Sequence, residues 1–199
     1  MRARTLGLVA VAVGALVLGL PAHAVTPLNF ADPAGDALDG RDEMDIVKVG
    51  YDLGKTKTGK PQLVITLQLA APPSLQLSAY GVEAQAHDTA ACGELEVDFR
   101  PGRALERIGT SPFEAWVSDC AGGVDLLTAQ GEVKGSTIKW FLPFDSLKKK
   151  QLAFGKIKDI RAFTGTVDPV FGLEGNASIE GNWLLPTDDA STDKVFSYK

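Results

Sequence analysis

The chain has 199 residues, a mean hydropathy close to zero and a formal net charge of −5. This length is sufficient for one domain with a sizeable hydrophobic core. An acidic balance argues against nucleic acid or an anionic membrane surface as the partner, because both are themselves negatively charged.

The first 24 residues have the pattern of a secretory signal peptide. Two arginines precede an apolar run from Leu6 to Leu20, and a proline and the small-residue triplet 22–24 follow it. The run is fifteen residues long, shorter than the roughly 20 that a membrane-spanning helix needs. We therefore expect cleavage before Val25 and a secreted, extracellular product with no membrane span, consisting of one domain over residues 25–199.

A concentration of acidic residues follows directly. Six carboxylates stand within fourteen positions, namely Asp32, Asp36, Asp39, Asp42, Glu43 and Asp45. Like charges at contact range repel by about 0.5–1 kcal/mol per pair even in water, so a folded loop of this composition needs a positive group at its centre. Calcium takes six to eight oxygen ligands, and a glycine-bent loop can direct several carboxylates at one point. The sequence predicts a calcium site with Asp32, Asp36 and Asp45 as ligands.

A second acidic cluster lies near the other end of the chain, in the segment PTDDASTDK over residues 186–194. The first and last strands of a sandwich are often neighbours, so we expect the two clusters to meet and Asp189 to be a fourth ligand. The alternative is that the first cluster is a solvated, flexible N-terminal arm whose charges only favour solubility.

Between the acidic clusters, apolar residues recur at every second position, which is the period of a half-buried strand. The clearest example is PQLVITLQLA at 61–70, and further strands are predicted over residues 47–53, 80–86, 93–99, 113–120, 123–133, 136–143 and 156–165. Only SLKKKQ at 146–151 is typical of a helix. Seven to nine short strands separated by Gly, Pro, Asp and Ser favour an all-β, antiparallel, jelly-roll-like β-sandwich.

Cys92 and Cys120 both lie in the exported part, where an oxidising environment favours pairing. We predict one disulfide between them. On the chain-entropy estimate, this bond stabilises the fold by about 3–4 kcal/mol.

The strand FEAWVSD contains the best candidate for a ligand-binding side chain. Alternation sends Phe113, Ala115 and Val117 inward, so that Glu114 and Trp116 face outward together. An exposed tryptophan beside a polar side chain is typical of a sugar-binding platform. The alternative is the reverse parity, or packing of Trp116 beneath a loop.

The runs FADPAGDA, DIVKVGYDL and PQLVITLQLA, with DDASTDKVFSY near the C-terminus, resemble secreted bacterial β-sandwich domains related to DOMON domains, the C-terminal domain of glucodextranase and family-nine carbohydrate-binding modules. The resemblance covers about the first fifty residues after the leader and the last dozen. It implies a jelly-roll-like sandwich with calcium near the D-P-x-G-D segment, and it implies carbohydrate as the ligand class.

These observations predict a secreted, non-catalytic binding or surface-interaction module, stabilised by calcium, whose partner is a polysaccharide or a cell-surface component. An enzyme is not expected. His87 is the only histidine after the leader and no G-x-S-x-G motif is present, so a nucleophilic triad lacks its parts. The alternatives are a glycosidase that uses paired carboxylates, which counting acids does not exclude, and a protease inhibitor.

Overall fold

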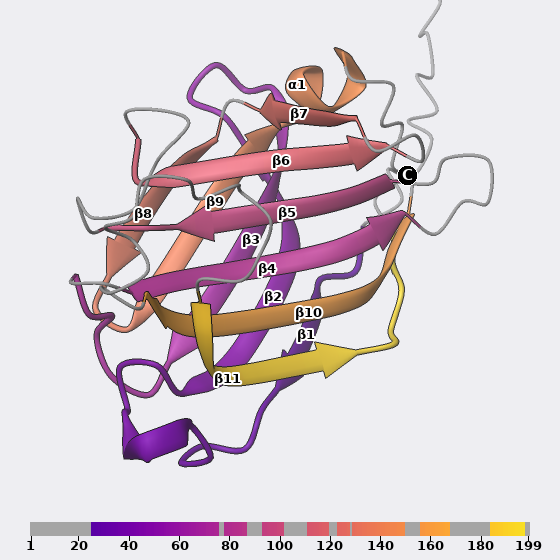
Figure 1. The fold of residues 1–199 in the computed structure, drawn as a ribbon. Helices are drawn as coiled ribbons and strands as arrows, with labels where there is room; N and C mark the ends of the chain where they lie inside the picture. Colours follow the sequence, from indigo (N-terminus) through magenta and orange to yellow (C-terminus); the bar gives the residue numbers. More distant parts are fainter. Residues whose placement is uncertain are drawn as a thin grey trace, which may run out of the picture.

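The structure is a computed structural model that describes residues 25–75, 78–86, 93–101, 111–119, 123–127, 129–149, 156–167 and 184–197. In these residues two antiparallel β-sheets pack face to face, which confirms the predicted all-β sandwich (Figure 1). The predicted signal peptide and both cysteines of the predicted disulfide, Cys92 and Cys120, lie outside the described residues.

The first sheet has five strands in the order β1-β2-β3-β9-β8. Their bounds are β1 Leu28–Ala31, β2 Ile46–Lys55, β3 Pro61–Leu69, β8 Gln130–Lys134 and β9 Thr137–Pro143. The hairpin between β8 and β9 turns at Gly135, whose φ of +59° is readily adopted only by glycine. The sequence had predicted a break at this position.

The second sheet has seven strands. Six of them follow the order β11-β10-β4-β5-β6-β7, and the seventh, β12, pairs with β10. Their bounds are β4 Ser78–Ala86, β5 Gly93–Phe99, β6 Phe113–Asp119, β7 Val124–Leu127, β10 Lys156–Val167, β11 Leu184–Thr192 and β12 Phe196–Ser197. The described helices are η1 Leu38–Gly40 and α1 Phe144–Lys149, of which α1 falls in the region predicted as helical.

Period-two alternation builds the core between the sheets. On β3 and β9 the alternate apolar side chains are fully buried, among them Leu63, Ile65, Ile138 and Trp140. The Trp140 indole N–H donates a hydrogen bond to the Asp98 backbone carbonyl in the opposite sheet, at 2.9 Å. Trp140 is therefore a core residue, and it satisfies its polar atom across the sandwich.

Two regions differ from the prediction. Residues 123–133 do not form one strand but divide into β7 and β8, which belong to different sheets, so the chain changes sheet between them. The short β1 and the acidic β11 were not predicted, and each is the edge strand of its sheet. Within the described residues no helix is long and apolar enough to cross a membrane.

Candidate metal site

The N-terminal acidic segment is folded onto the sandwich and is not a loose arm. Met44 is fully buried, and its backbone carbonyl accepts a hydrogen bond from the Thr164 hydroxyl of β10 at 2.7 Å. The neighbouring Glu43 carbonyl accepts one from the Tyr80 hydroxyl of β4 at 3.2 Å. Two strands of the second sheet therefore hold the end of the segment that leads into β2, which favours a folded loop over the flexible-arm alternative.

Local sequence chemistry sets the shape of the loop between β1 and β2. Gly35 has a φ of +90°, a conformation that residues with a Cβ rarely adopt. Its backbone N–H donates a hydrogen bond of 2.7 Å to Oδ2 of Asp45, which lies ten residues further on. The bond closes the loop on itself and turns the D-P-A-G-D segment toward the start of β2.

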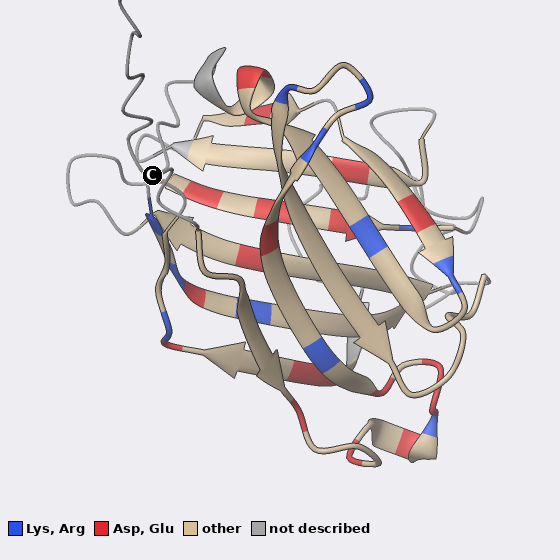
Figure 2. Ribbon diagram, turned by 180° about the vertical axis from the view of Figure 1, so that it is seen from behind, with Lys and Arg blue, Asp and Glu red and all other residues tan. Residues whose placement is uncertain are grey.

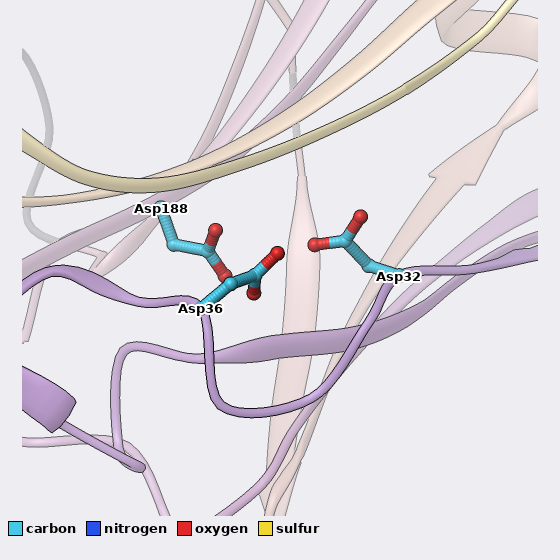
Figure 3. A group of neighbouring side chains, drawn as sticks. All are labelled: Asp32, Asp36 and Asp188. Atoms are coloured by element: carbon cyan, nitrogen blue, oxygen red, sulfur yellow. The ribbon is translucent and has the colours of Figure 1, made fainter.

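Three carboxylates converge where this loop meets β11. Oxygen atoms of Asp32, Asp36 and Asp188 all lie within 4.8 Å of one another, and Figure 3 shows the three side chains directed toward a common point. Asp188 is held in place by the backbone N–H of Ile46, which donates to its Oδ2 at 2.6 Å. The two acidic clusters of the sequence therefore meet, as predicted, and we refer to Asp32, Asp36 and Asp188 as the acidic triad.

Burial and mutual repulsion raise the pKa values of two carboxyls of the acidic triad, Asp32 and Asp188. The pKa of Asp32 rises from 3.8 to about 6, mainly because the carboxyl is partly desolvated and then because Asp188 and Asp36 repel its negative charge. Burial also raises the pKa of Asp188, and Asp36 and Asp45 add to this effect by repulsion. A cation at this point would offset the repulsion that these carboxylates exert on one another.

Two oxygen atoms beside this point are buried with no hydrogen-bond partner, counting every partner the described structure supplies. They are Oδ2 of Asp32 and Oδ1 of Asp45. Asp45 is 1% exposed, so its second oxygen is withdrawn from solvent. Unsatisfied buried carboxylate oxygens are costly, and they are the groups that a hard cation would coordinate.

The donor set consists of carboxylate oxygens, which suit calcium, magnesium or manganese better than zinc or copper. The two segments that supply these oxygens lie near opposite ends of the sequence, one in the β1–β2 loop and one in β11. Figure 2 shows acidic segments gathered at this end of the sandwich, around the loop that carries η1. The geometry is thus that of a site able to hold one metal ion between the two sheets.

The structure places the four predicted metal ligands differently. Asp32 and Asp36 belong to the acidic triad, and Asp45 lies beside it as the acceptor that fixes the loop. Asp189 points to the opposite face of β11, where its carboxylate lies 3.5 Å from the Arg161 guanidinium. Its neighbour Asp188 takes the position in the triad, because successive residues of a strand face opposite sides.

The predicted pair on β6 shares one face but is not exposed. Glu114 and Trp116 both face away from the core, while Ala115 and Val117 between and after them belong to it. However, Trp116 is only 7% exposed and Glu114 only 3% exposed. The Arg100 guanidinium lies over the Trp116 ring, 5.5 Å from its centroid. The two side chains therefore lie on the outer face of the sheet, as predicted, but they are buried there and do not form the expected exposed aromatic platform.

Comparison of the chain with protein-family models, with curated proteins and with solved structures gave no match. The resemblance to DOMON-like and carbohydrate-binding domains stays a prediction from the quoted sequence runs. The function must be argued from the site itself.

Proposed function

We propose that the chain is a secreted, non-catalytic binding or surface-interaction module, in which a calcium ion at the acidic triad fastens the N-terminal loop to β11. The observation that carries this proposal is the convergence of Asp32 and Asp36 with Asp188, more than 150 residues away along the chain. A cation bound among the three carboxylates would offset their mutual repulsion.

Calcium is the cation that best fits the surroundings of the triad. Magnesium requires near-ideal octahedral geometry and keeps several waters, whereas calcium accepts irregular sets of six to eight oxygens. The three side chains come from a bent loop and from the edge strand β11, two segments far apart in the sequence, rather than from one regular element. Asp45 lies outside the triad, but its Oδ1 is unpartnered and its charge adds to the repulsion on Asp32, which a cation would also offset.

The partner we propose is a polysaccharide or another component of a cell surface, and this part of the proposal is supported by the resemblance alone. The burial of Trp116 argues against that side chain as the platform for a sugar ring.

Glycosidase chemistry has less support than binding. The directly opposed carboxyls Asp98 and Glu114 are 0% and 3% exposed, so a glycosidic bond could not reach them.

Thermal unfolding with calcium and with chelator tests the metal site. At a free calcium concentration about a hundred times the Kd, binding adds about 2.7 kcal/mol to the free energy of unfolding. For a domain of this size, we expect the melting temperature to rise by about 5–10 °C relative to the same protein in EDTA.

Two variants make the test specific. Asp36→Asn should remove most of the calcium-dependent rise, because it takes one carboxylate from the triad. Asp39→Asn removes the same charge from the same loop, but Asp39 is exposed and lies outside the triad, and its φ of 64° suits asparagine. Asp39→Asn should keep the full rise. An equal melting temperature in calcium and EDTA for the unmodified protein would refute the site.

A further inference from the structure

The outer face of the second sheet, turned away from the sandwich core, carries a group of carboxyl side chains. The alternation that buries the apolar residues of β5 in the core places Glu96 and Asp98 on this outer face. Glu83 of β4 lies opposite Glu96, and Glu114 of β6 lies opposite Asp98. Directly opposed residues on antiparallel strands have Cβ atoms about 5 Å apart, so like charges at these positions repel. Figure 2 shows the acidic positions that recur on these strands in the rear sheet.

Among the described residues, the buried part of this group holds more carboxyls than cations. Asp98 is fully buried and forms an ion pair with Arg100, whose side chain is 19% exposed. Arg161 lies at the edge of the group with half its side chain in solvent, and it is shared between Glu83 at 3.8 Å and Asp189 at 3.5 Å. Among the described residues, Arg100 is thus the one cation within the buried part, facing several carboxyls.

Four polar atoms at Asp98 and its neighbours are buried with no hydrogen-bond partner in the described structure, namely Oδ1 of Asp98, Nε of Arg100, Oε2 of Glu114 and the Trp116 indole N–H. Oδ1 of Asp98 is buried with no hydrogen-bond partner, and it is held against Gly81 and the Phe163 ring, where a Cβ on Gly81 would collide with both. The Trp116 indole N–H lies close enough to lower the pKa of Asp98, yet it makes no hydrogen bond of good geometry. An ionised Asp98 keeps one carboxylate oxygen without a hydrogen bond in an apolar setting, beside further carboxyls that share the single cation Arg100, and a bound proton lowers this cost.

We propose that Glu96 and Asp98 together form a proton-binding site that holds a proton at neutral pH, where an exposed carboxyl is already ionised. The charged groups around this pair in the described structure are Glu94 and Arg100 on β5, Glu83 on β4 with Arg161 of β10 beyond it, and Glu114 on β6. With one proton bound by the pair, Arg100 balances the charge that remains on it.

The pKa values of the two carboxyls agree with this geometry. Burial, and then repulsion by Asp98, raises the pKa of Glu96 from 4.5 to about 8, against the lowering effect of Arg100. Burial also raises the pKa of Asp98, and again Arg100 opposes the change. The two groups titrate as a pair, so the site is assigned to both and not to one of them.

A proton held by the folded state makes the stability of the protein depend on pH. The folded state binds a proton that the unfolded state releases, because an unfolded carboxyl has its ordinary pKa near 4.5. The free energy of unfolding should therefore fall as pH rises from about 4.5 through about 8. A carboxyl whose pKa is lowered by folding, which is the common case, would make the free energy of unfolding rise with pH.

The test counts protons on unfolding. We would unfold the full secreted chain thermally near pH 7 in saturating calcium, and measure proton release by calorimetry in buffers of different ionisation enthalpy. The unmodified protein should release about one more proton than the Glu96→Gln and Asp98→Asn variants. Glu132→Gln removes the same charge from an exposed position of β8 and should release as many protons as the unmodified protein.

A second measurement needs no variant and covers the case in which Glu96→Gln or Asp98→Asn fails to fold. The ¹³C resonances of the side-chain carboxyls in the unmodified protein should show a titration step for Glu96 near pH 8. Equal proton release by all four proteins, or completion of both titrations at the ordinary carboxyl pKa, would overturn the assignment. Calcium is present throughout, so a negative result here leaves the metal site untouched.

Discussion

At the scale of single residues, Asp188 and Asp189 are adjacent in the sequence and opposite in role. Asp188 faces the acidic triad, whereas Asp189 faces Arg161 on the outside of β11. In calcium, we expect Asp188→Asn to weaken calcium binding at least about tenfold, equivalent to about 1.4 kcal/mol. In EDTA the same variant should be as stable as the unmodified protein or more stable, because it removes a charge that raises the pKa of Asp32.

The adjacent substitution Asp189→Asn is the matched control for the different effects of Asp188→Asn in calcium and in EDTA. Its exposed ion pair with Arg161 contributes little, so the change in stability should stay within about 0.5 kcal/mol in either condition. Calcium affinity from isothermal titration and melting temperatures in both buffers provide the measurement. A loss of stability for Asp188→Asn that is equal in calcium and in EDTA would mean that Asp188 only supports the fold through its bond to Ile46.

At the scale of elements, the packing on the outer face of the neighbouring strands β10, β4 and β5 depends on a glycine in β4. Gly81 leaves room for the Phe163 ring and the Asp98 carboxyl, and both lie where its Cβ would be. We expect Gly81→Ala to destabilise the protein by about 1–3 kcal/mol, because the surrounding sheet cannot move away without breaking its pairing. The midpoint of urea unfolding at unchanged slope measures this loss.

A rescue experiment separates overpacking from a change in strand propensity. Phe163→Leu removes much of the ring that the alanine methyl would meet, so it should recover part of the stability lost by Gly81→Ala. The double-mutant cycle isolates this coupling. Simple additivity of the two substitutions would show that contact with the ring is not the cause.

The sequence was informative wherever a strand had one apolar face. The alternation on β2, β3 and β9 predicted the sandwich, and the alternate apolar side chains of these strands are buried in its core. It could not find β11, because Pro186 and the two aspartates that follow resemble a loop, and without the strand the parity that selects Asp188 over Asp189 is undefined. It placed Glu114 and Trp116 on the outer face correctly, but exposure depends on what covers a face, which local spacing does not encode.

At the scale of the whole molecule, the acidic triad lies between an edge of one sheet and an edge of the other. Among the described strands, β1 pairs with β2 alone and β11 with β10 alone, so each has a neighbour on one side. The triad takes two carboxylates from the loop after β1 and one from β11. A bound ion would therefore tie the free edge of one sheet to the free edge of the other.

This arrangement predicts where calcium acts. On chelation, amide hydrogen exchange should speed up in β1, β11 and the loop over residues 32–45, while the central strands β3 and β5 keep their protection, because edge elements open at lower free energy than the core. Hydrogen-exchange mass spectrometry with calcium and with EDTA maps this difference by peptide. A uniform change over every peptide would instead indicate that the ion raises global stability without local closure, and no change in 32–45 would contradict ion binding there.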